Sequence, residues 1–240
     1  MIRVNDVSTK LGGRQILEQV SFEVEAGETV ALVGANGAGK TTILRCLLGI
    51  VHYTGSIQIK GIPLEKEPVA AKELIGYMPQ VPAFFEETVK ESLAFLAKLR
   101  GIDSAEIWPL LERVGLGKDA ARPVRVLSTG MRQRLSLAAS LIGHPPILIL
   151  DEPTASVDLK GQVEIIKFLQ KLQSEGQTIL ISSHRAEEVR ALVDRIVVMD
   201  QGKVIAAGPV EEVASTIWGD AGLQNDESIP YGAFRARRVK

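Results

Sequence analysis

Residues 34–41 read Gly34-Ala35-Asn36-Gly37-Ala38-Gly39-Lys40-Thr41, which is a glycine, four residues, and then Gly-Lys-Thr. Glycines let a backbone wrap a phosphate group so that successive N–H groups point inward. A helix beginning at Gly39 adds the positive end of its dipole. Lys40 is then placed to reach the β- and γ-phosphates of a nucleotide, and the Thr41 hydroxyl is a natural ligand for Mg²⁺. We therefore predict a phosphate-binding loop.

The flanking residues fit this interpretation. Thr29–Val33 is a strand-length apolar run that leads directly into the loop. Gly39–Gly49 follows as a predicted helix, with apolar residues at helical spacing: Ile43, Leu44, Leu47 and Leu48. A glycine-rich turn would match the eight-residue pattern by accident in roughly one chain in a hundred. The strand–loop–helix context makes that alternative weaker still.

A pair of carboxylates follows another apolar run, Ile147–Leu150. Asp151 would hold Mg²⁺ directly or through water, and Glu152 could polarise the attacking water. The alternative is a solvated strand end before the turn at Pro153, which would explain the pair equally well in isolation. Beside a phosphate-binding loop, the catalytic interpretation is favoured.

Short β-rich runs alternate with helical patterns along the chain, which indicates an α/β fold with a largely parallel sheet. Further strands are predicted at Val20–Val24, Ser56–Lys60, Ile75–Met78, Ile147–Asp151, Thr178–Ser182 and Arg195–Met199. Helices are predicted at Val89–Leu99, Ala105–Val114 and Gly130–Leu141, as a helical lobe inserted into the core. From Gly219 onward the periodicity is weak, and we expect a poorly ordered tail.

Composition excludes several classes of protein. The 240 residues carry 28 basic and 29 acidic side chains, a net charge of -1, without the basic excess expected of a nucleic-acid-binding protein. Cys46 is the single cysteine, so no internal disulfide can form, as suits a reducing cytosol. No apolar run approaches the ~20 residues of a membrane helix, and the first residues lack the apolar region of a signal peptide. We expect a cytoplasmic protein that could serve a membrane only from the water side.

Four further motifs resemble those of the ABC ATPases. The run Asp151-Glu152-Pro153-Thr154-Ala155-Ser156-Val157-Asp158 resembles the Walker B motif and D-loop of that family. Leu127-Ser128-Thr129-Gly130-Met131-Arg132-Gln133-Arg134 resembles the ABC signature, with Ser128 as the helix N-cap. Gln80 matches the Q-loop glutamine, and His184 matches the switch histidine. The motifs stand in the family's order and spacing, and the resemblance covers roughly Ile2 to Val213.

The resemblance implies an α/β fold: a P-loop NTPase core with a mostly parallel sheet, an N-terminal antiparallel β portion and an inserted helical lobe. It implies one ABC ATPase domain over residues 1–218. The core would comprise residues 1–86 and 144–218, the lobe residues 87–143, and the tail residues 219–240.

The resemblance also implies a mechanism that uses ATP and Mg²⁺. In the family two subunits pair head to tail around two ATP molecules, so that Ser128 and Gly130 would contact the γ-phosphate of the partner's nucleotide. Asp158 would link the two sites across the dimer. The implied partners are a second ATPase subunit (an identical copy or a sister subunit) and a transmembrane permease subunit, with membrane contact only through that permease. No nucleic-acid partner is expected.

The expected site residues fall into three groups. The catalytic residues would be Glu152 and His184, and the metal ligands Thr41, Gln80 and Asp151. The nucleotide would contact Gly34, Ala35, Asn36, Gly37, Ala38, Gly39, Lys40, Thr41, Thr42, Leu11, Gln80, Ser128, Gly130 and Asp158. Leu11 stands where most of the family carries an aromatic residue that stacks on adenine, so weaker nucleotide binding or looser base selectivity is expected.

Two alternatives compete with a transport motor. A non-transport ABC ATPase usually carries a coiled-coil insertion, zinc-binding cysteines or a second cassette, and this chain has none of these signals. A non-hydrolysing ATP-binding regulatory subunit would be favoured if Glu152 or His184 were replaced, and both are present. The run Gly130-Met131-Arg132-Gln133-Arg134 resembles a branch rich in exporters, which points to export.

Overall fold

The central sheet of the protein is mostly parallel. The computed structural model describes residues 1–82 and 87–213. Six strands pair in the order β10-β9-β3-β8-β7-β6, and all but β10 run parallel. Their bounds are β3 Thr29–Val33, β6 Ile75–Met78, β7 Ile147–Asp151, β8 Thr178–Ser183, β9 Arg195–Asp200 and β10 Lys203–Pro209.

A second, antiparallel sheet is built from the N-terminal part of the chain. Its order is β2-β1-β4-β5, with β1 Ile2–Leu11, β2 Arg14–Val24, β4 Thr54–Ile59 and β5 Ile62–Pro63. Gly12 and Gly13 close the β1–β2 hairpin at φ of 55° and 78°, in the left-handed region that glycine adopts without steric cost. The two sheets and the helices give the predicted α/β fold with its N-terminal antiparallel portion.

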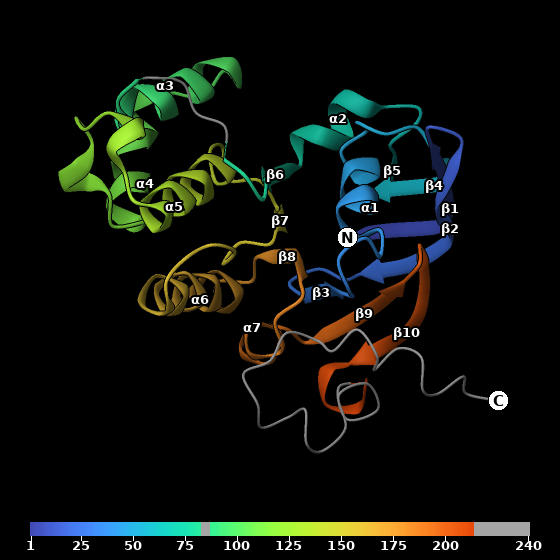
Figure 1. Cartoon of the computed structure of the whole chain (residues 1–240). Coiled ribbons are helices and arrows are strands. Elements are labelled where there is room, and N and C mark those ends of the chain that lie inside the picture. The colour runs from blue at the N-terminus through green and yellow to red at the C-terminus, as the bar shows by residue number, and fades with distance from the viewer. Residues whose placement is uncertain (83–86, 214–240) are drawn as a thin grey trace.

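The helices divide between the core and one end of the molecule. Figure 1 shows α3, α4 and α5 gathered at one end and the β1–β2–β4–β5 sheet at the opposite side. Their bounds are α1 Lys40–Leu47, α2 Pro68–Glu73, α3 Val89–Leu99, α4 Ile107–Arg113, α5 Thr129–Ser140, α6 Leu159–Ser174 and α7 Ala186–Leu192, with 3₁₀ turns at Ser104–Glu106, Gly117–Asp119 and Val124–Val126. None of the helices in the described ranges is long and apolar enough to cross a membrane.

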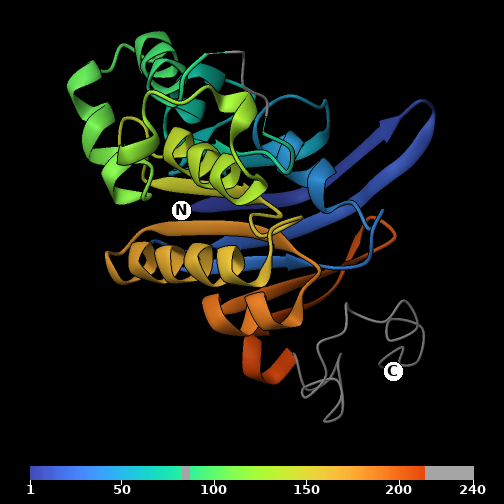
Figure 2. The ribbon, with the colours of Figure 1, turned by 60° about the vertical axis from the view of Figure 1, so that its left-hand side comes forward.

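The parallel sheet is buried on both faces, which explains its continuous apolar strands. In β3, Ala31 and Val33 pack into a cluster with the residues of α3 to α7, whereas Val30 and Leu32 face α1 and the antiparallel sheet. Helices α6 and α7 lie side by side against one face (Figure 2). The loops at the strand ends are therefore held by packing on both sides.

Most predicted elements lie where expected, and some predicted bounds were wrong. The strands Thr29–Val33, Ile75–Met78 and Ile147–Asp151 and the helix Val89–Leu99 have the predicted bounds. The strand predicted at Val20–Val24 is longer and begins at Arg14, because its polar half pairs with β1. The helix predicted at Ala105–Val114 opens instead as a 3₁₀ turn, which Asp103 caps by accepting a hydrogen bond from the Ala105 N–H.

The elements between residues 87 and 143, where the helical lobe is predicted, are all helices or 3₁₀ turns. The division into a core of residues 1–86 and 144–218 and a lobe of residues 87–143 stays a prediction. The tail of residues 219–240 lies outside the described residues.

Candidate functional site

Parallel strands bring the predicted residues to one edge of the sheet. The phosphate-binding loop follows β3, Asp151 ends β7, and His184 follows β8. The strand register sets Val33 opposite Ser183, and Asp151 opposite Ser182. In open α/β sheets ligands bind at the carboxyl ends of the strands, which is where these residues meet.

The phosphate-binding loop is packed too tightly for side chains at two of its glycines. A Cβ on Gly34 would lie 2.3 Å from the carbonyl oxygen of Met199. Gly39 has φ of 104°, and a Cβ there would lie 2.7 Å from Cδ2 of Leu17. The loop is therefore wedged between β9 and the β1–β2 hairpin. Its tip, at Asn36 and Gly37, is exposed, and the Ala38 N–H donates to the Ala35 carbonyl (3.1 Å).

Lys40 opens α1 and is buried inside the loop, with 6% of its surface exposed. Its Nζ donates to the carbonyls of Gly34 (2.7 Å) and Ala35 (3.3 Å) and lies 3.7 Å from Oε1 of Glu152. Burial lowers the pKa of Lys40, while the charges of Glu152 and Asp151 raise it. A cation held in this way is placed for an anionic ligand in the loop.

Thr41 and Asp151 bring together two oxygen atoms of the kind that could hold a metal ion. The Thr41 hydroxyl donates to Oδ1 of Asp151 (3.2 Å), and the Ser182 hydroxyl donates to the same oxygen (2.5 Å). Mg²⁺ is typically bound by one or two protein oxygens together with substrate phosphates and water. A buried carboxylate and a hydroxyl beside a phosphate-binding loop fit that donor set.

Glu152 connects the lysine to the predicted switch histidine. It is buried with a φ of 51°, and its N–H donates to the carbonyl oxygen (3.2 Å) and the hydroxyl (3.0 Å) of Ser182. Nδ1 of His184 lies 2.7 Å from Oε2 of Glu152. That hydrogen bond raises the pKa of His184, although burial opposes it. Glu152 is thus held between the Lys40 ammonium group and the His184 imidazole.

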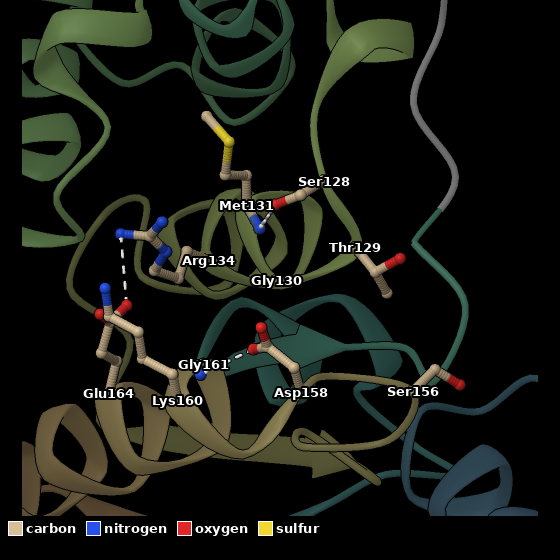
Figure 3. Close-up of a pocket in the computed structure, with 10 residues that line it drawn as sticks. All are labelled: Ser128, Thr129, Gly130, Met131, Arg134, Ser156, Asp158, Lys160, Gly161 and Glu164. Carbon is tan, nitrogen blue, oxygen red and sulfur yellow. Dashed lines mark hydrogen bonds and ion pairs between the residues drawn. The ribbon is translucent and has the colours of Figure 1, made fainter.

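The predicted signature residues line a separate pocket of about 400 Å³. Ser128 caps α5 by accepting a hydrogen bond from the Met131 N–H (3.2 Å), as predicted. Figure 3 shows Ser128 and Gly130 on the α5 side of this pocket and Asp158 on the α6 side. Asp158 caps α6 through the Gly161 N–H (2.9 Å). An exposed pocket at a helix N-terminus is a suitable place for an anion.

Three further predicted site residues lie on β1, after β6 and on α1. Leu11 ends β1 with 43% of its surface exposed. Gln80 follows β6 and is exposed, and its carbonyl oxygen is 3.5 Å from Nε2 of Gln133. Thr42, in the first turn of α1, is half-buried. Their roles in nucleotide or metal binding stay predictions.

Sequence reasoning missed two polar residues of the site. Ser182 bridges Asp151 to the backbone of Glu152, and only the strand register could have indicated this. Gln133 is buried in α5 with its Nε2 near the carbonyls of Gln80 and Ala155. Gln133 stands within the signature run, and the available signal was its position on the buried side of the helix.

The chain is similar to known proteins over most of its length. A family model described as ABC transporter matches residues 17–155. The linearmycin resistance ATP-binding protein LnrL of Bacillus subtilis is 35% identical over 230 residues, which cover 93% of this chain and 74% of that protein. The Nod factor export ATP-binding protein I of Burkholderia lata is 37% identical over 213 residues, 86% of this chain and 70% of that protein.

A solved structure agrees with these relatives. The ATP binding subunit of an ABC transporter superposes with a TM-score of 0.80 at 29% identity, covering 95% of both chains. The sequence matches and the fold, together with the loop, carboxylate and signature geometry, lead to one assignment. The chain belongs to the ABC transporter family, as one of its ATP-binding subunits.

Proposed function

We propose that the chain binds Mg²⁺ and ATP and hydrolyses ATP to drive export through a separate transmembrane permease. The observation that carries this proposal is the position of Glu152, held between Lys40 and His184 and next to the Thr41–Asp151 pair. A buried carboxylate beside a phosphate-binding loop is placed to act as a general base on water.

Each residue of this cluster has a distinct role in the proposed reaction. Lys40 and the N-terminus of α1 stabilise the negative charge of the β- and γ-phosphates. Glu152 accepts a proton from the attacking water, and His184 orients Glu152 and contacts the γ-phosphate. Thr41 and Asp151 would hold Mg²⁺, which would supply positive charge against the phosphate oxygens. Gln80 is assigned to the metal or the water.

The second half of each site comes from another subunit in this proposal. The pocket lined by Ser128, Gly130 and Asp158 would receive the γ-phosphate of a nucleotide carried by the partner. The partner is a second copy of the chain or a sister subunit. A lone chain would then hold two incomplete half-sites.

Export and membrane association rest on the relatives. One of them is named as a linearmycin resistance ATP-binding protein and another as a Nod factor export ATP-binding protein. The chain would lie at the cytoplasmic face of the membrane and contact it only through the permease. As for the domains, we assign residues 1–218 to one ATPase unit, with residues 87–143 as its helical lobe.

Phosphate release by the purified chain tests the reaction. We expect ATP hydrolysis that requires Mg²⁺ and stops with excess EDTA, because the phosphate charges then lack their counter-ion. Specific activity should rise with protein concentration, because both halves of the site come together only in a dimer. Specific activity that is independent of concentration would contradict the shared site, and absent hydrolysis would favour a non-hydrolysing subunit or a missing sister subunit.

Substitution of Leu11 by tyrosine tests the adenine contact. We expect ATP to bind at least about fivefold more tightly, because base stacking on an aromatic ring contributes about 1–3 kcal/mol and about 1.4 kcal/mol is a factor of ten in affinity. Titration with a fluorescent ATP analogue would measure the change, and Leu99→Tyr, at an exposed leucine of α3, is the matched control. Equal affinities in the Leu11→Tyr and Leu99→Tyr variants would place the adenine away from the end of β1.

A further inference from the structure

A buried carboxyl group lies behind the predicted switch histidine. Glu188 is in the first turn of α7 and has only 1% of its surface exposed. Burying a carboxyl group lowers the stability of a protein unless the group is paired or hydrogen-bonded. A buried glutamate is therefore expected to have a specific role. Nothing in the proposed chemistry of Lys40, Glu152 and Asp151 uses this side chain.

Glu188 is tied to the turn that carries His184. The Ser183 hydroxyl donates to Oε2 of Glu188 (2.6 Å) and accepts a hydrogen bond from the Arg185 N–H (3.1 Å). These two bonds fasten the residues immediately before and after His184. The imidazole on that turn then makes its 2.7 Å contact with Oε2 of Glu152.

On these contacts we propose that Glu188 is a positioning residue for ATP hydrolysis: through the Ser183 hydroxyl, it holds the turn that presents His184 to Glu152. The inference rests on the proposed hydrolytic function. Glu188 does not touch the reacting atoms. It acts by keeping the imidazole in place, because a displacement of about 1 Å in a catalytic group strongly lowers the rate of a reaction.

The surroundings of Glu188 raise the pKa of its carboxyl group. Burial raises the pKa of Glu188 to about 7; the charge of Glu152 adds to this, and the hydroxyls of Ser183 and Thr154 and the charge of Arg185 oppose it. Oε1 is buried and has no hydrogen-bond partner within the described residues. A glutamine has the same shape without a charge, so it should preserve the contact with Ser183.

Four variants test the positioning role. We expect Glu188→Ala and Ser183→Ala to lower the kcat for ATP hydrolysis roughly tenfold, as for partial loss of an acid–base group, with KM for ATP within about twofold. Glu188→Gln should recover most of the kcat, because it retains an acceptor for the Ser183 hydroxyl. Glu187→Ala removes the exposed neighbouring carboxylate of α7 and should behave as wild type.

The second readout does not depend on hydrolysis. The chain has three histidines, His52, His144 and His184, whose imidazole resonances can be assigned by single substitutions. In Glu188→Ala and Ser183→Ala the His184 resonance should shift while those of His52 and His144 stay in place. Thermal unfolding would first establish that each variant folds. If Glu188→Ala does not fold, Ser183→Ala takes its place, because the smaller substitution leaves a smaller cavity.

The outcomes separate this inference from the proposed function. Folded variants with an unmoved His184 resonance, or with a moved resonance and wild-type kcat, overturn the positioning role. A wild-type chain without ATPase activity overturns the proposed function, while the His184 resonance still reports whether Glu188 holds the turn. A shifted resonance together with a lower kcat that Glu188→Gln restores supports both.

Discussion

Replacing Glu152 with glutamine is expected to lower the rate of ATP hydrolysis by roughly 10³-fold and to leave a stable dimer in Mg-ATP. Glutamine has the same shape but cannot accept the proton from the attacking water, and general bases contribute about 10²–10⁴-fold. ATP should still bind, because Lys40 and the loop are unchanged. The two subunits then stay joined around nucleotide that they cannot cleave.

Light scattering and phosphate release measure the two effects in the same sample. Wild type should hydrolyse ATP and remain mostly monomeric, whereas Glu152→Gln should be dimeric only when ATP is added. Glu73→Gln, at an exposed carboxylate of α2, should match wild type in both assays. A monomeric Glu152→Gln protein that still hydrolyses ATP would remove Glu152 from the mechanism.

The same substitution changes the protonation of His184. The hydrogen bond with Glu152 is the largest contribution that raises the pKa of His184. Without the carboxylate the pKa should fall, because burial and the charges of Lys40 and Arg185, which lower it, remain. The histidine of the variant then loses its proton at a lower pH than that of wild type. The imidazole resonance followed against pH would record this fall, and an unchanged pKa would contradict the contact.

The parts of the fold that could be predicted are those in which burial alone sets the pattern. Strands β3, β6 and β7 are almost wholly buried, so the apolar run gives their bounds directly. Gly34 follows β3, Pro79 follows β6, and β7 ends in the charged Asp151. Strand β10 was missed because its residues alternate between exposed and half-buried, which leaves only a weak signal. Helix α6 is predictable from the same kind of pattern, since Ile165, Leu169 and Leu172 recur at helical spacing on its buried face.

The site could be predicted as a set of residues but not as a set of contacts. The loop and the Asp151–Glu152 pair are local patterns, and their positions follow from the strand–loop–helix order. The contact of Glu152 with His184 joins residues 32 positions apart. It depends on the pairing of β7 with β8, which no local pattern determines. Ser182 and Glu188 were missed for the same reason, because each acts through a neighbouring strand or turn.

Blocking the signature pocket is expected to stop hydrolysis as completely as damaging the loop. Ser128→Arg places a long side chain in the pocket where the partner's γ-phosphate is proposed to bind, and Lys40→Ala removes the cation of the loop. Each variant alone should hydrolyse ATP at least roughly 10²-fold more slowly. The reason is that the negative charge of the transition state loses a group positioned to stabilise it. Ser128→Ala is the control for the lost helix cap, which by itself costs about 1 kcal/mol of stability.

Mixing the two inactive proteins then distinguishes a shared site from a site within one chain. In a two-fold symmetric pair each subunit contributes both halves of the interface, so a mixed dimer has one composite site with Lys40 and Ser128 both intact. An equal mixture forms mixed dimers in about half of all pairs, and its phosphate release should return to about a quarter of wild type if the two sites act independently. Light scattering of the mixture with ATP establishes that dimers form. Dimers without any recovered hydrolysis would mean that Ser128 acts on the nucleotide of its own chain.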